Sequence, residues 1–202
     1  MKIVGAKSLG NDIKIQMSEI FVDGFYQWLQ FFSKDKNKLV KAFSHIFNLD
    51  VFYFAVIDGE IAGIIACTDE KMPSVRLNRK EFRKHLGIIR GIITYFMLKR
   101  EFEDKKYPFE ISEGMGMVEF VATSPINRGK GVATAIMNEI ILSTVYDEYV
   151  LEVADTNTAA IKLYEKLGFK EFLRIKQKHS ERSGVNHLVY MKFCKTKWKD
   201  IQ

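Results

Sequence analysis

The first fifty residues contain two stretches in which hydrophobic residues recur every three or four positions. This spacing predicts amphipathic helices over residues 18–32, with Ser18 as N-cap, and over residues 35–47. Residues 3–4 and 13–15 read as a short first strand or its flanks. The predicted inward positions are Phe21, Phe25, Trp28, Leu29 and Phe32 in the first helix and Leu39, Phe43, Ile46 and Phe47 in the second.

Two apolar runs then predict a pair of strands over residues 51–57 and 60–68. Asp58 and Gly59 separate them, and an Asp-Gly pair between apolar runs is a strong signal for a tight β-hairpin. The sequence therefore predicts an antiparallel hairpin here.

Residues 79–106 carry another helical pattern, with basic residues clustered at both ends. We expect one long or two shorter amphipathic helices, with Gly87 and Gly91 as weak points. The apolar positions that step by three and four are Phe82, Leu86, Ile89, Ile93 and Phe96.

The rest of the chain alternates strand-like and helix-like segments. This order predicts an α/β fold, an α+β mixed sheet flanked by helices, in one domain over residues 1–202 with a helical insertion at about 70–110. The expected elements are strands at 115–123, 148–153, 169–177 and 187–193 and helices at 129–146 and 157–167.

Composition excludes several classes of protein. With 47% hydrophobic and 28% charged residues the chain is neither disordered nor collagen-like. The apolar stretch 86–98 is too short to span a bilayer, and the N-terminus lacks a signal-peptide core, so we expect a cytoplasmic location. Cys67 and Cys194 are expected to be buried thiols, and the four scattered histidines give no metal-ligand spacing. No metal is therefore expected.

One strand–helix junction carries the pattern of a phosphate site. The predicted strand ends near Pro125 and is followed by Arg128-Gly129-Lys130-Gly131 at the start of a helix. Glycines allow backbone N–H groups to approach an anion, and a helix N-terminus adds positive potential. The segment is neither a P-loop nor the dinucleotide fingerprint, since the Gly-Lys-Ser/Thr ending is missing and Thr134 occupies the third glycine position.

This junction resembles the phosphate loop of the GNAT superfamily of acetyl-CoA-dependent N-acetyltransferases, which has the form Arg/Gln-x-x-Gly-x-Gly/Ala. Here it reads Arg128-Gly129-Lys130-Gly131-Val132-Ala133, and the segment 157–169, with Asn157, Ala160, Tyr164, Lys166, Gly168 and Phe169, looks like the family's later cofactor-side motif. The resemblance covers residues 50–193, with its motifs in 117–169. The insertion at 70–110 departs from the family pattern and bears on the substrate rather than on the cofactor.

The resemblance implies acetyl-CoA as co-substrate, lying between the strand ending near Thr123 and the strand ending near Val153. Backbone groups of the first strand would pair with the pantetheine amides and polarise the thioester carbonyl. The cofactor-binding residues expected from the family are Val121, Ala122, Thr123, Arg128, Gly129, Lys130, Gly131, Val132, Ala133, Thr134, Asn157 and Tyr164.

Two residues are candidates for proton transfer. Tyr164 stands where the family commonly places a tyrosine that protonates the departing thiolate, although its ring could simply pack. Glu119 interrupts an apolar strand, on the face that strict alternation assigns to Met117, Val121 and Thr123. It could take a proton from an ammonium substrate, directly or through water, although the family match places that base nearer Met117. The alternative is a salt-bridged or edge-exposed carboxylate. Asn157 is also expected to cap a helix.

Three functions stay open from the sequence. The first is transfer of an acetyl group to a primary amine, small molecule or peptide, by direct attack, because no cysteine or serine has a nucleophile-like context. The second is a non-catalytic CoA-binding sensor. The third uses residues 79–106 as a surface for nucleic acid or anionic membrane; the net charge of +6 suits CoA equally well, and the expectation is neither partner. The basic tail at 195–199 could touch a nucleic acid or a partner, but we expect a solvated terminus. A homodimer is left open.

Overall fold

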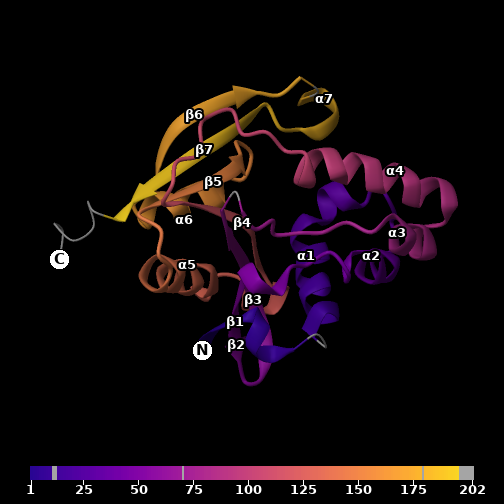
Figure 1. The fold of residues 1–202 in the computed structure, drawn as a ribbon, viewed down its shortest axis with the longest axis horizontal. Coiled ribbons are helices and arrows are strands. Elements are labelled where there is room, and N and C mark those ends of the chain that lie inside the picture. Colours follow the sequence, from indigo (N-terminus) through magenta and orange to yellow (C-terminus); the bar gives the residue numbers. More distant parts are fainter. Residues whose placement is uncertain (11–12, 70, 179, 196–202) are drawn as a thin grey trace.

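The computed structural model describes residues 1–10, 13–69, 71–178 and 180–195 (Figure 1). Most of the basic tail at 195–199 lies outside these ranges. The centre of the molecule is a mixed sheet in the order β1-β2-β3-β4-β5-β7-β6, in which β4 and β5 are parallel and the other neighbours antiparallel. The strands are β1 (Lys2–Gly5), β2 (Phe52–Ile57), β3 (Glu60–Thr68), β4 (Met115–Thr123), β5 (Glu148–Ala154), β6 (Lys170–Lys176) and β7 (His187–Cys194).

The predicted hairpin is confirmed as β2 and β3. Asp58 and Gly59 have φ angles of 51° and 85°, and positive φ at both central residues is what the twist of a two-residue hairpin turn requires. The short first strand at 3–4 is also confirmed, because β1 pairs with β2. Residues 13–15 are not strand, since α1 begins at Lys14.

Helices cover both faces of the sheet (Figure 1). On one face α5 and α6 enclose a core around Ile136, Ile140 and Tyr149. On the other face α1, α2, α3 and α4 enclose a second core that reaches β3 and β4. The helices are α1 (Lys14–Leu29), α2 (Lys36–Phe43), α3 (Arg79–Leu86), α4 (Ile88–Leu98), α5 (Val132–Ser143), α6 (Thr158–Lys166) and the short α7 (Ser180–Ser183). The mixed sheet flanked by helices is therefore confirmed.

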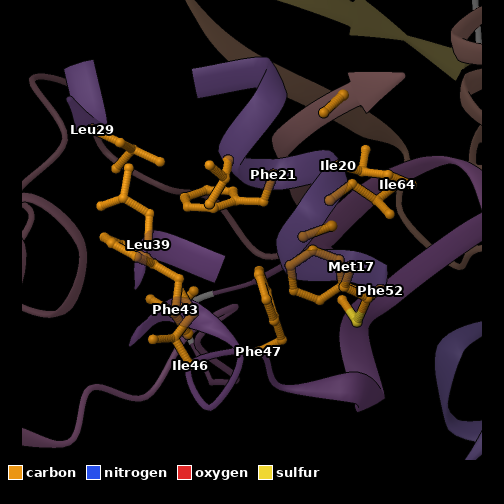
Figure 2. Close-up of a cluster of buried hydrophobic side chains, with 14 of the residues drawn as sticks. Met17, Ile20, Phe21, Leu29, Leu39, Phe43, Ile46, Phe47, Phe52 and Ile64 are labelled. Atoms are coloured by element: carbon orange, nitrogen blue, oxygen red, sulfur yellow. The ribbon is translucent and has the colours of Figure 1, made fainter. Parts of the chain in front are cut away.

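The second core is built on aromatic rings (Figure 2). Phe21 of α1 is 1% exposed and lies 5.5 Å from Phe43 and 5.6 Å from both Phe47 and Phe120, between ring centroids. Tilted and edge-on pairs at these separations stabilise a core beyond the area they bury. This packing holds α1 and α2 against β4 near Phe120.

Ser18 is not an N-cap. It lies in the interior of α1, is fully buried, and donates a hydrogen bond from Oγ to the Val40 carbonyl of α2 at 2.8 Å. The helix starts four residues earlier because Met17 already belongs to the buried face. The second helix is shorter than predicted, running from the cap at Asp35, which accepts from the Lys38 amide, to Phe43.

The insertion forms two helices rather than one. The break falls at Gly87, where φ is 84°. Gly87 was one of the two expected weak points, and this prediction is confirmed. Gly91 lies inside α4 and serves packing instead, because a Cβ there would come within 2.5 Å of the Arg83 Cα in α3. The predicted helix to residue 106 is too long, since α4 ends at Leu98 in a π-helical turn (η4, Lys99–Glu103).

Candidate active site

The parallel pair β4–β5 is joined over only part of its length. Register pairs connect residues 115–118 of β4 with residues 148–151 of β5, and none connects residues 119–123. The strands therefore part beyond Val118 and Leu151, while β4 stays paired with β3 as far as Thr123. Backbone groups on the β5 side of residues 119–123 are thereby free of a strand partner.

A β-bulge occurs in β4 at this parting. Glu119 pairs with Ala66 and Ala122 with Ile64, so two residues of β4 face one of β3, and Phe120 takes a φ of 53°. A bulge inserts one residue and reverses the alternation of side chains beyond it. Glu119 consequently does not share a face with Val121, which packs on the core under α5. The strict alternation predicted for this strand is wrong from residue 120 onward.

The glycine-rich loop lies between β4 and α5. Gly131 is the N-cap of α5 and, like Gly129, has a φ of 76°, in the left-handed region that favours glycine. A Cβ at either position would meet nothing within 4 Å, so the space in front of these backbone groups is open. Arg128 and Lys130 are exposed on the same loop. The predicted helix at 129–146 is thus α5, and its start is set by Gly131.

The first turn of α5 leaves amide groups without helical acceptors, as every helix N-terminus does. Val132 is 2% exposed and anchors this turn, and a Cβ on Gly63 would come within 2.7 Å of its Cγ1. The helix N-terminus is therefore held directly against β3. Ala133 and Thr134 lie in the same turn, half-buried, so the structure brings the predicted loop residues 128–134 together in one anion-binding geometry.

The Glu119 carboxylate, at the parting of the strands, accepts two side-chain hydrogen bonds. Ser74 Oγ donates to its Oε2 at 2.5 Å, and the Tyr107 hydroxyl donates to its Oε1 at 2.8 Å. These contacts place the carboxylate in a cavity of about 550 Å³, on the sheet face opposite α5. Burial, followed by the Glu119 charge, raises the pKa of Tyr107 above its usual value, so its hydroxyl stays protonated.

A second carboxylate, Glu152 of β5, pairs with Lys105, one of the residues that line this cavity. Its Oε2 is 3.1 Å from Lys105 Nζ, and that ammonium lies 4.9 Å from the ring centroid of Tyr107. Burial and a hydrogen bond to Glu152 raise the pKa of Tyr190 in β7. These contacts, together with the Phe109 ring 5.5 Å from Tyr190, hold residues 105–109 over the parting of β4 and β5.

Ser74, Tyr107, Lys105 and Glu152 were not among the site residues expected from the sequence. Residues 74 and 105–107 lie in irregular segments, although the predicted helical pattern extends to residue 106, and they approach β4 and β5 only through the fold. The one signal was Glu119 itself, since a carboxylate inside an apolar strand needs polar partners.

Tyr164 lies on the α5–α6 side of the sheet. It is 6% exposed, and its ring centroid is 6.0 Å from that of Phe169. Burial raises the pKa of its hydroxyl, which keeps the phenol protonated at neutral pH. Asn157 is confirmed as the N-cap of α6, because its Oδ1 accepts from the Ala160 amide at 3.2 Å.

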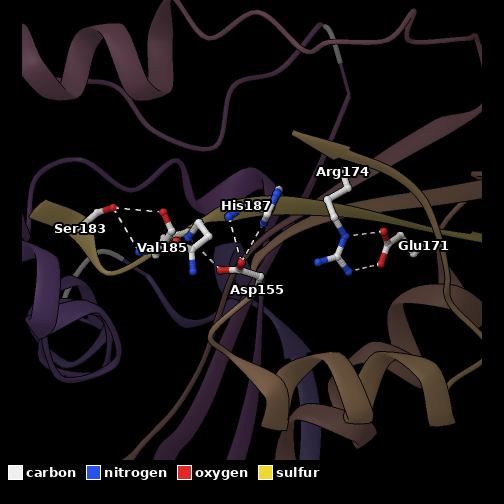
Figure 3. A network of polar contacts seen from close by, with 7 residues as sticks. Asp155, Glu171, Arg174, Ser183, Val185 and His187 are labelled. Atoms are coloured by element: carbon white, nitrogen blue, oxygen red, sulfur yellow. Dashed lines mark hydrogen bonds and ion pairs between the residues drawn. The ribbon is translucent and has the colours of Figure 1, made fainter. Parts of the chain in front are cut away.

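The remaining candidates for metal or nucleophilic chemistry have structural roles. Cys67 is buried as expected, and burial raises its pKa to about 12, so its thiol is protonated at neutral pH. Cys194 is only half-buried, contrary to the expectation, and its Sγ donates to Glu148 Oε1 at 3.3 Å. Asp155 accepts hydrogen bonds from the His187 ring and backbone (Figure 3), which fastens the start of β7 beside the end of β5. No cluster of three metal-ligating side chains exists within the described residues.

The described helices also include none that could cross a bilayer.

Comparison with protein families places the chain in a known family. A model described as "Acetyltransferase (GNAT) family" matches residues 16–169. The chain belongs to the GNAT acetyltransferase family. The matched region spans α1 to Phe169 and so contains the loop 128–134, Glu119 and Tyr164. No curated protein sequence matches the chain.

Solved GNAT structures share the fold of this chain. An N-acetyltransferase from Staphylococcus aureus Mu50 is 15% identical with a TM-score of 0.63, covering 96% of this chain and 100% of its own. A ribosomal-protein-alanine N-acetyltransferase from Brucella melitensis is 14% identical with a TM-score of 0.57, over 96% and 99%. The Escherichia coli ribosomal-protein-S18-alanine N-acetyltransferase is 13% identical with a TM-score of 0.53, over 96% and 92%. At these identities the likeness concerns the fold alone.

Proposed function

We propose that this GNAT protein transfers an acetyl group from acetyl-CoA to a primary amine by direct attack. The observation that carries the proposal is the parting of β4 and β5 with Glu119 beside it. The glycine loop follows β4 by a few residues, and the cavity with Glu119 opens on the opposite sheet face. A cofactor and an amine can therefore approach the parting from two sides.

The loop 128–134 suits the pyrophosphate of CoA. The open space before Gly129 and Gly131 admits a phosphate, the amides of the first α5 turn donate to it, and Arg128 and Lys130 add positive charge. Backbone groups of residues 121–123, which have no partner in β5, would hold the pantetheine amides and the thioester carbonyl. When bound, acetyl-CoA supplies the activated acetyl group.

Glu119 is the proposed base. A protonated amine must lose a proton before its nitrogen can attack, and Glu119 accepts that proton directly or through a water molecule. Ser74 and Tyr107 orient the carboxylate and leave further lone pairs on both oxygens for the substrate.

The charge of the cavity supports an amine acceptor. Asp69 and Glu103 line it together with Glu119, against a single lining lysine, Lys105. Lys105 is paired with Glu152 and Glu103 with Lys99, which leaves the charges of Asp69 and Glu119. The lining is therefore negative overall, which favours a cationic substrate.

Tyr164 is the proposed acid, and Tyr164→Phe tests this role by removing only the hydroxyl. We expect the rate of acetyl transfer to fall by about 10²-fold, the scale of positioned general-acid catalysis, with unchanged acetyl-CoA affinity and melting temperature. Tyr149→Phe is the matched control. Tyr149 is a fully buried tyrosine of the same core whose hydroxyl bonds Thr144, so its loss should lower the melting temperature and leave turnover intact. Normal turnover of the Tyr164 variant, where chemistry limits the rate, would rule out the acid role.

The function as a whole is tested with acetyl-CoA and a panel of amines. We expect acetyl-CoA to raise the melting temperature, because a ligand bound only by the native state stabilises it by mass action, and we expect free CoA thiol to appear when a suitable amine is added. An unchanged melting temperature at millimolar acetyl-CoA would contradict the cofactor assignment. Stabilisation without turnover of any amine would instead favour a CoA-binding sensor.

A further inference from the structure

Helix α4 presents its apolar side to solvent. Ile88, Ile89, Ile93, Phe96 and Met97 are between 44% and 74% exposed. At 100° per residue these five side chains, with the half-buried Ile92 among them, fill about half of the helix circumference. Figure 1 shows α4 at the outer edge of the molecule, with α3 on its inner side.

The side of α4 that faces the protein is the less apolar one. Its buried residues are Gly91, Thr94 and Leu98. Gly91 lets the backbone of α3 approach, and Thr94 Oγ1 donates to the Arg90 carbonyl of its own helix at 2.8 Å. An amphipathic helix on a globular protein normally turns its apolar side inward. The outward side of α4 is therefore not explained by the core of this chain, and an apolar patch of this kind marks an interaction surface.

The same two helices are rich in basic residues. Helices α3 and α4 contain five Lys or Arg and one Glu, a net charge of +4, and Lys99 and Arg100 follow at once. Lys99 is paired with Glu103 and Asp104, so the unpaired cations lie in α3, in α4 and at Arg100. Arg83, Arg90 and Arg100 are exposed, and none of the ion pairs found within the described residues involves them. The apolar side of α4 is thus accompanied by unpaired guanidinium groups.

We propose that α4, with the basic residues of α3 and the following turn, is a docking surface for a bilayer that carries anionic headgroups. An apolar helix side enters the headgroup and acyl boundary while neighbouring Lys and Arg side chains contact lipid phosphates. A second copy of this chain fits less well, because two such surfaces would bring like charges together. A nucleic acid would use the arginines and leave the isoleucines exposed.

The test is co-sedimentation of the full chain with phosphatidylcholine vesicles, with and without phosphatidylglycerol. We expect binding only to the anionic vesicles, weakening as salt is raised. Ile89→Ser with Phe96→Ser should reduce binding by about tenfold or more, and Arg83→Gln with Arg90→Gln by a similar factor.

Matched control variants test whether the loss of binding is specific to this surface or follows from removing any exposed apolar or basic side chain. Leu142→Ser with Val145→Ser removes apolar side chains that are 60% and 89% exposed elsewhere, and Lys41→Gln with Lys170→Gln removes exposed charges elsewhere. Both pairs should bind vesicles like the parent chain, and all four double variants should keep its melting temperature.

Three results would overturn the proposal. The first is no binding to anionic vesicles by the parent chain, and the second is equal binding to neutral vesicles or an equal loss in the controls. The third is evidence for another partner. A dimer in sedimentation velocity that Ile89→Ser with Phe96→Ser abolishes would assign the surface to a second copy of the chain. Binding to a nucleic acid that only the arginine variants weaken would assign it to that polyanion.

Discussion

Gly131→Val is expected to lower the affinity for acetyl-CoA by about 100-fold or more, equivalent to ~2.8 kcal/mol. The side chain would occupy the open space before the α5 N-terminus, and its β-branch is incompatible with the φ of 76° at this position. Two or more amide hydrogen bonds to a charged phosphate would be lost, each contributing about 1.5–3 kcal/mol. Affinity is measured by calorimetry, or by the ligand-induced rise in melting temperature.

Gly59→Val is the matched control for backbone strain. Gly59 has a φ of 85° in the β2–β3 turn, and a Cβ there also meets nothing within 4 Å. Both variants should lose a similar amount of stability without ligand, and only Gly131→Val should lose the response to acetyl-CoA. Unimpaired binding by a folded Gly131→Val protein would place the phosphate site elsewhere.

Glu119→Gln is expected to reduce kcat for amine acetylation by about 10³-fold near neutral pH, within the range for a positioned general base. The amide keeps the volume, accepts from one of the two hydroxyls of Ser74 and Tyr107 through its oxygen and donates to the other through its NH2 group, but it cannot take up the proton of the ammonium substrate. The affinity for acetyl-CoA should not change, since the carboxylate lies on the sheet face away from α5. Steady-state kinetics across a range of pH measures the effect.

Glu103→Gln controls for the charge of the cavity. Glu103 lines the same cavity, and its Oε1 accepts from the Leu77 amide at 2.7 Å. Its neutralisation should raise KM for a cationic amine and leave kcat nearly unchanged. If the two variants changed the same parameter by the same factor, Glu119 would be acting only through its charge.

Local patterns were sufficient to predict the elements whose geometry is set within a few residues. Asp58-Gly59 predicted the hairpin because both positions adopt positive φ, and Gly129 and Gly131 marked the open loop for the same reason. Gly87 marked the helix break. The family motifs indicated membership of the GNAT family, which is confirmed because a GNAT model matches the chain from residue 16 to residue 169.

Tertiary structure alone decided the surroundings of Glu119 and the direction of α4. The bulge at Phe120 arises from pairing between β3 and β4 and changes which residues share a face with Glu119. Ser74 and Tyr107 reach that carboxylate across 45 and 12 residues of sequence. Periodicity shows that α4 has an apolar side but cannot say what faces it, because that depends on where α3 packs, and α3 packs on Gly91. The sequence thus determined most of the elements and the glycine loop, and long-range packing determined which side chains meet.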